Sequence, residues 1–143
     1  MADEFNTSFV DYTFVAFGGA LGALFRFLLT TAFQNQKYFI FWGCPAFPIS
    51  TLLVNILGSF LIGVFYFFFS QSALGNDSIR LFAVVGFLGS FTTFSTFSLE
   101  TFMLLKQGSA FTAVFFASLS VLTCVLSTLL GFGITRILIA PSM

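Results

Sequence analysis

The sequence lacks histidine and has very few charged residues. Only 7% of its 143 residues are charged, and five basic residues balance five acidic ones. A water-soluble domain has about a quarter of its residues charged, so this composition excludes a soluble globular surface. The absence of histidine excludes imidazole catalysis and the usual histidine-containing zinc sites. The two cysteines, Cys44 and Cys124, show no metal or redox spacing. We expect Cys124 to pack as a small buried apolar residue.

Nucleotide-binding and secretory motifs are also missing. Gly18 and Gly19 lack the GxGxxG spacing and the strand that a dinucleotide site needs, so we expect neither a nucleotide nor a nucleic acid as a partner. We assign Gly18, Gly22 and the pair Ser59 and Gly63 to close helix packing, because small residues four apart let helix backbones approach. The first fourteen residues carry three acidic residues and no basic one, unlike a secretory signal, so we expect the first apolar segment to be retained.

Apolar residues are abundant, at 58% of the chain. No charged residue occurs between Lys37 and Asp77 or between Lys106 and Arg136. Each gap can hold the roughly 20 apolar residues that cross a bilayer. Turn-forming residues separate the apolar segments. We therefore predict an all-α integral membrane protein with a single membrane domain, residues 1–143. Its four transmembrane helices are predicted at residues 12–33, 47–69, 81–105 and 110–136.

The basic residues give no preferred orientation in the membrane. Orientation normally follows an excess of lysine and arginine in cytoplasmic loops. With four spans, Arg80 and Arg136 fall on one side, whereas Lys37 and Lys106 fall on the other, with Arg26 nearest to that side. This balance has two readings. In the first reading the tally is even simply because a short chain has few charges. In the second the chain inserts in both orientations and pairs head-to-tail with itself.

The segment Gly86–Glu100 is the most unusual part of the chain. Its sequence, GFLGSFTTFSTFSLE, places six hydroxyl side chains among four phenylalanines. Gly86 and Gly89 precede the hydroxyls and predict a break in the third helix, which we place at Gly89–Thr92. A broken backbone in hydrocarbon is tolerated only where protein buries it or where it lines a cavity. The segment therefore indicates the working part of a transport pathway.

Polar side chains elsewhere in the predicted helices each have two readings. Arg26 either reaches the lipid headgroups or places a positive charge at a pore mouth. Asn55 either links helices or offers N–H donors to an anion. Glu100, the only carboxylate within a predicted helix, either reaches the interface or acts as an intramembrane acid. Ser120 begins a polar stripe that suits an ion track, although such hydroxyls often bond their own backbone.

Phe94 and Phe97 are three residues apart and therefore share one helix face. In a chain with 25 phenylalanines, most such pairs face lipid or the core. The flanking hydroxyls favour a second reading, because the edge of an aromatic ring is electropositive and can contact a small anion. Conduction needs weak, multiple sites of this kind.

These motifs resemble the Fluc family of fluoride channels, also called CrcB. The resemblance runs through GGALGALFRFLL (18–29), TLLVNILGSFLIG (51–63) and GFLGSFTTFSTFSLE (86–100), and more loosely through the last helix. It implies a passive, fluoride-selective channel of the plasma membrane that exports cytoplasmic fluoride and relieves its toxicity. It also implies an antiparallel, dual-topology homodimer with two fluoride pores and a structural sodium ion on the two-fold axis.

The resemblance also implies roles for individual residues. Gly89 and Thr92 match the positions whose backbone carbonyls hold the sodium ion in relatives. The other matches concern the fluoride pathway: Arg26 and the pore-lining Asn55, then Phe94 and Phe97 of the "Phe box", then Ser95 and Thr96 of the hydroxyl-rich break, then Glu100, and Ser120 of the polar track.

The last helix departs from the family pattern at two positions. Phe116 stands where tyrosine or asparagine is expected, and Cys124 stands where serine or glycine is usual. The resemblance therefore does not define the anion contacts on this helix.

Two other functions fit the residues. A proton-coupled exporter of small molecules needs a titratable acid in the membrane, for which Glu100 is the only candidate. A membrane scaffold that transports nothing needs no such residue. Release of fluoride and of chloride from loaded liposomes, with and without a pH gradient, separates the three functions.

Overall fold

The computed structural model describes residues 8–34, 47–70 and 77–139, and every element in these ranges is helical. Three spans are single helices: α1 (Phe9–Gln34), α2 (Ile49–Ser70) and α6 (Ala110–Ile139). The remaining span is built from α3 (Asp77–Arg80), the π-helix η1 (Leu81–Leu88), α4 (Gly89–Phe91) and α5 (Phe94–Lys106). The predictions for Lys37 and Cys44 lie outside the described residues.

All four predicted membrane helices are confirmed, because four segments are long and apolar enough to cross a bilayer. The ends differ by a few residues. The third span begins earlier than predicted, at Asp77, because the short helix α3 continues into η1. The last span runs on past Arg136 to Ile139. The π-helix was not predicted.

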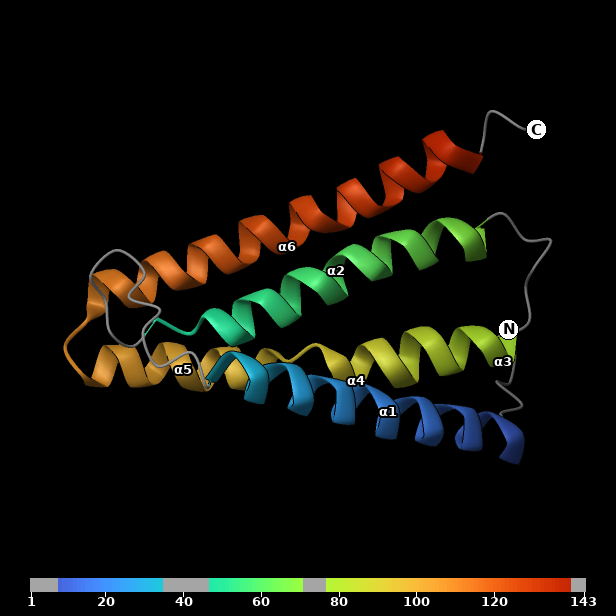
Figure 1. Ribbon diagram of the computed structural model, residues 1–143, viewed down its shortest axis with the longest axis horizontal. Coiled ribbons are helices and arrows are strands. Elements are labelled where there is room, and N and C mark those ends of the chain that lie inside the picture. The colour runs from blue at the N-terminus through green and yellow to red at the C-terminus, as the bar shows by residue number, and fades with distance from the viewer. Residues whose placement is uncertain (1–7, 35–46, 71–76, 140–143) are drawn as a thin grey trace, which may run out of the picture.

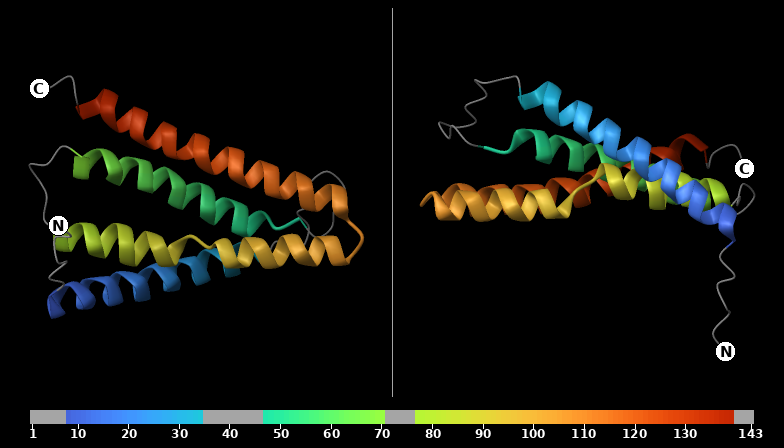
Figure 2. Two further views of the ribbon diagram at one scale, coloured as in Figure 1. Left: turned by 180° about the vertical axis from the view of Figure 1, so that it is seen from behind. Right: turned by 90° about the horizontal axis from the view of Figure 1, so that it is seen from below.

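The helices form an elongated bundle (Figure 1). In this view α2 lies between α6 and the third span, and α1 lies on the far side of the third span. Two sets of helices make the main packing contacts: α1 packs against η1 and α4, and α2 packs against α6. In addition, α5 packs on α6. Figure 2 shows α1 crossing the bundle obliquely. The start of α1 and the end of α6 lie at the same end, as an even number of spans requires.

Glycines set the close approach within each pair of helices. A side chain at Gly18 or Gly22 would overlap the backbone of η1, and a Cβ at Gly86 would lie 2.7 Å from a backbone oxygen of α1. At the other pair, side chains at Gly63 and Gly131 would overlap the backbones of α6 and α2. The predicted packing roles of Gly18, Gly22 and Gly63 are confirmed.

Two apolar clusters lie on either side of the break in the third span. The first consists of Phe47, Leu52, Leu104, Ala113 and Phe116, and the second of Val54, Leu88 and Phe91. Only 11–28% of each membrane-crossing segment is buried inside the chain. The outer faces carry large exposed side chains such as Phe111 and Leu138. An apolar surface of this extent is suited to lipid or to another chain rather than to water, so the fold is that of a multi-pass membrane protein.

Candidate functional site

The third span is interrupted at Thr92 and Thr93, between α4 and α5. Thr92 has φ −78° and ψ 154°, and Thr93 has φ −146° and ψ 108°, so both are extended. The predicted break at Gly89–Thr92 is therefore wrong at its start, since Gly89 is helical with φ −61° and ψ −34°. Gly86 is also helical, inside η1. Gly86 packs closely against α1, and neither glycine breaks the helix.

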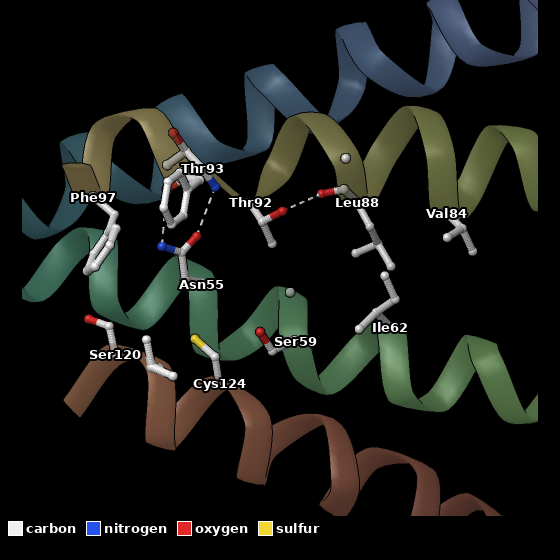
Figure 3. Close-up of a pocket in the computed structure, with 14 residues that line it drawn as sticks. Asn55, Ser59, Ile62, Val84, Leu88, Thr92, Thr93, Phe97, Ser120 and Cys124 are labelled. Carbon is white, nitrogen blue, oxygen red and sulfur yellow. Dashed lines mark hydrogen bonds between the residues drawn. The ribbon is translucent and has the colours of Figure 1, made fainter. Parts of the chain in front are cut away.

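Asn55 on α2 forms two hydrogen bonds with the backbone at the break (Figure 3). The backbone N–H of Thr93 donates to Asn55 Oδ1 at 2.9 Å, and Asn55 Nδ2 donates to the Thr93 carbonyl at 3.3 Å. One side-chain amide thus satisfies both backbone groups of an extended residue in the middle of a span, where no water is available. Of the two readings of Asn55, these hydrogen bonds confirm the one in which it links helices. This pair uses only one of the two N–H groups of the amide.

The Thr93 side chain then starts the next helix. Its Oγ1 accepts a hydrogen bond from the backbone N–H of Thr96 at 3.2 Å, which is the usual N-cap arrangement. The same hydroxyl donates to Thr96 Oγ1 at 2.9 Å and lies 3.3 Å from Ser95 Oγ. The hydroxyls of Ser95 and Thr96 therefore stabilise the start of α5.

The break also changes the partners of two backbone carbonyls. In a continuous helix the N–H of Thr93 would bond the Gly89 carbonyl, and the N–H of Thr96 would bond the Thr92 carbonyl. Here the first N–H donates to Asn55 Oδ1 and the second to Thr93 Oγ1. The Gly89 and Thr92 carbonyls thus do not receive these two helical hydrogen bonds.

A cavity of about 330 Å³ lies beside the break, between α2, the third span and α6 (Figure 3). Its lining includes six of the predicted site residues: Asn55, Gly89, Thr92, Phe94, Phe97 and Ser120. The other four do not line it: Arg26, Ser95, Thr96 and Glu100. The sequence reasoning missed Gly58, where a side chain would overlap the Thr92 methyl group. Its position next to Ser59, as a pair of small residues between Leu57 and Phe60, was the available signal.

The two phenylalanines of the pair differ in their surroundings. Their ring centroids are 5.4 Å apart, which confirms that they share a face. Phe94 is 78% exposed at the edge of the cavity. Phe97 packs on Phe116, at a centroid distance of 5.4 Å, and Phe116 is fully buried. Phe116, which departs from the family pattern, is therefore a core residue that supports Phe97.

Ser120 places an unpartnered hydroxyl in the cavity. The side chain is only 5% exposed, and its Oγ has no hydrogen-bond partner within the described residues. The other α6 hydroxyls behave differently: those of Thr123 and Thr135 donate to backbone carbonyls one turn earlier in the same helix. Thr128 donates both to Cys124 and across to Ser59 on α2. Of the predicted polar stripe, only its first turn reaches the cavity.

Cys124 follows Ser120 by one turn and also lines the cavity. Its thiol is free and partly exposed. The prediction that Cys124 is simply buried is therefore wrong, because α6 turns this residue toward the cavity and not into either apolar cluster.

Glu100 lies one turn beyond Phe97 on α5 and faces α2. Thr51 on α2 interacts with its carboxylate. Its second oxygen, Oε2, is buried and has no partner in the part of the chain that the structure describes. This burial favours the reading of Glu100 as an intramembrane acid. The sequence reasoning missed Thr51, although it stands one turn before Asn55 and so shares its helix face.

Arg26 is partly buried on α1. Because α1 packs mainly against η1 and α4, this arginine is not brought to the cavity within one chain. Its backbone carbonyl accepts a hydrogen bond from Thr30 Oγ1 at 2.9 Å.

The fold and the site define a class of multi-pass, all-α membrane proteins with a cavity at a broken helix. Residues 13–132 match the family model described as "CrcB-like protein, Camphor Resistance (CrcB)". The chain belongs to the CrcB family.

Three similar proteins, all named "Fluoride-specific ion channel FluC", come from Magnetococcus marinus, Hahella chejuensis and Legionella pneumophila. The first is 42% identical over 90% of this chain and 100% of its own length. The second is 36% identical over 88% of this chain and 94% of its own length. The third is 47% identical over 68% of each chain. The name that these relatives carry is that of an ion channel and not of an enzyme.

Proposed function

We propose that this chain forms a fluoride-selective channel of the plasma membrane that lets cytoplasmic fluoride leave passively. The observation that carries this proposal is the buried hydroxyl of Ser120, which has no partner within the described ranges of the chain, beside the same cavity as Phe94 and Phe97. A buried hydroxyl without a partner is costly, so its retention needs an explanation. A permeating ion that accepts its hydrogen bond supplies one. The name of the relatives supports fluoride as that ion.

The chemistry of the cavity suits a small anion. Ser120 offers an O–H donor, and Asn55 has an N–H that its contact with Thr93 does not use. Phe94 and Phe97 offer electropositive ring edges, which attract an anion without holding it as tightly as a full charge would. Several weak sites in succession allow an ion to enter and also to leave.

Passive exit is sufficient to relieve fluoride toxicity. Hydrogen fluoride crosses membranes as a neutral acid and dissociates at cytoplasmic pH, which leaves fluoride trapped inside as an anion. A pathway for the anion then lowers the internal concentration without a coupled energy source. In this channel Arg26 attracts anions to the pathway. Polar neighbours along the pathway are Ser95, Thr96 and Glu100. In the single chain these four residues lie outside the cavity.

The proposed assembly is an antiparallel homodimer with two pores. Phe94 lines the cavity and is still 78% exposed in the single chain, and a second copy is suited to cover it. In the sequence the basic residues are balanced between the two sides of the four spans, with Arg80 and Arg136 on one side and Lys37 and Lys106 on the other, which suits insertion in both orientations. An antiparallel pair related by an axis in the membrane plane would bring the same mid-span segments together.

The break fits a structural sodium ion in this dimer. The Gly89 and Thr92 carbonyls have both lost their helical N–H partners, and two copies would supply four such oxygens. Carbonyl oxygens freed at a broken helix are typical ligands of sodium in membrane proteins. When bound, the ion would supply positive charge that holds the two copies together at the break.

The proposal is tested by reconstituting the purified chain into liposomes loaded with sodium fluoride or sodium chloride. A fluoride or chloride electrode records release after an ionophore for the counter-cation is added. We expect fluoride release without a pH gradient and much slower chloride release. Equal release of both ions would contradict the selectivity. Release that requires a pH gradient would favour the proton-coupled exporter, and no release at all would favour the scaffold.

A further inference from the structure

Cys124 is a free thiol inside the cavity that the proposed pathway uses. It lies on α6 one turn beyond Ser120, and its side chain is partly exposed. Figure 3 shows the Ser120 and Cys124 side chains pointing from α6 toward Asn55 and Phe97. The Cys124 carbonyl accepts a hydrogen bond from Thr128 Oγ1 at 3.1 Å, and the same hydroxyl bonds Ser59 on α2. This contact fixes the turn of α6 that presents the thiol.

We propose that Cys124 is a modification site for neutral, thiophilic organomercurials, and that its modification stops ion transport. This inference rests on the proposed channel function, because a modified Cys124 can stop transport only if ions pass through the same cavity.

Ser120 gives separate evidence that a ligand or an ion enters this cavity. Ser120 lines the cavity, and its hydroxyl is buried and has no partner among the described residues. A protein group that is left unpaired at this depth marks a place that a ligand or an ion visits. Because Cys124 stands one helical turn away and lines the same space, a molecule that reaches Ser120 also reaches the thiol.

The remaining lining explains why a neutral, aromatic reagent suits the site. Ile62, Val84, Leu88 and Val121 give the cavity largely apolar walls. A charged reagent would lose its hydration there, whereas a phenyl group is suited to such walls. The cavity volume of about 330 Å³ leaves room for one ring beside the sulfur. Soft metals bind cysteine sulfur in preference to the amide and hydroxyl oxygens nearby.

The reaction with phenylmercuric acetate is balanced without an oxidant. A mercury–sulfur bond forms, the S–H bond and the mercury–acetate bond break, and the proton leaves with acetate as acetic acid. The phenyl group stays on mercury and remains in the cavity. An excess of a small dithiol removes the phenylmercury and restores the free thiol.

The test compares the unmodified chain with Cys124→Ser and Cys44→Ala in fluoride-loaded liposomes. Each variant is compared with its own rate before phenylmercuric acetate is added. We expect the rate of the unmodified chain and of Cys44→Ala to fall about tenfold and to recover with dithiol, because a filled pathway cannot conduct. The Cys124→Ser variant should keep its own rate. Equal inhibition of Cys124→Ser would overturn the proposal.

Intact-protein mass spectrometry on the same samples gives a readout that does not depend on transport. Cys44→Ala retains only Cys124 and should gain one phenylmercury group per chain. Absence of this adduct would overturn the modification site. Adduct formation with undiminished fluoride release would overturn the proposed block. If untreated liposomes release no fluoride, the channel function itself fails, and the mass still decides whether Cys124 reacts.

Discussion

The two halves of the third span have opposite characters. The half before the break, Leu81–Phe91, packs its backbone against α1 at Gly18 and Gly22, and two of its side chains, Leu88 and Phe91, belong to an apolar cluster. The half after the break packs on α6 and carries the hydroxyls, the exposed Phe94 and Glu100. A single asparagine on α2 separates the two halves. One span thus anchors the fold against α1 with its first half and presents Phe94 and Phe97 to the cavity with its second.

The largest effect is expected at the glycine packing of the first half. In Gly22→Ala the new methyl group overlaps the η1 backbone, which cannot move as a flexible side chain does. Overpacking of this kind costs about 1–3 kcal/mol or more, so we expect a lower yield of folded protein and a lower melting temperature in detergent. Gly133→Ala is the matched control, because a Cβ there meets no atom within 4 Å. Equal stability of the two variants would contradict the packing account.

The next effect concerns the residue that separates the halves. In Asn55→Asp the carboxylate still accepts from the Thr93 N–H but cannot donate to its carbonyl, and it adds a negative charge to the cavity. We expect fluoride release to fall by about tenfold or more, since like charge repels a permeating anion. The measurement is the electrode assay in liposomes. Thr135→Ala removes a hydroxyl that only bonds its own helix and should conduct normally. Normal fluoride release from Asn55→Asp would contradict the assignment of the break to the fluoride pathway.

A smaller effect is expected when one ring edge is removed. Phe94 is largely exposed, so Phe94→Ala should fold normally and lower fluoride release by about tenfold through loss of a weak anion contact. Phe111→Ala is the control, because Phe111 is 84% exposed on α6 and does not line the cavity. Release is compared at equal protein density in the liposomes. The role of Phe94 would be refuted if both variants conducted alike.

The smallest effect is expected at Glu100, which lies beside the cavity and not in its lining. Glu100→Gln keeps an acceptor for the Thr51 hydroxyl and removes the charge. A passive channel should then retain fluoride release within about threefold. Release is measured with and without a pH gradient. Complete loss of transport, or loss of a dependence on the gradient, would support the proton-coupled exporter instead.

Much of the fold could be predicted from the sequence, because long stretches without charge determine where helices cross a bilayer. The pairing of Gly18 and Gly22 with a neighbouring helix could also be predicted, since spacing alone puts small residues on one face. The position of the break could not. It depends on hydrogen bonds between Asn55 and Thr93, which are 38 residues apart, and glycine spacing gave the wrong start.

The site could be predicted only in part for the same physical reason. Residue types and the family resemblance indicated Asn55, Phe94, Phe97 and Ser120, which the fold brings to one cavity. The contact of Thr51 with Glu100 joins two helices and leaves no local pattern in either. The exposure of Cys124 depends on the rotation of α6 against α2, which a composition of small and apolar residues does not determine.

The most direct test of the central claim, that the cavity beside the break conducts fluoride, is the release rate of Ser120→Ala. The lost hydroxyl has no partner among the residues that the structure describes, so folding stability should not fall, whereas the permeating ion loses a hydrogen bond. A bond of about 1 kcal/mol corresponds to about fivefold in rate. The matched control is Thr123→Ala, because the Thr123 hydroxyl donates to the Leu119 carbonyl at 2.7 Å within the same helix. We predict fluoride release about fivefold slower for Ser120→Ala than for Thr123→Ala, at unchanged melting temperature. Equal release by the two variants would contradict the claim.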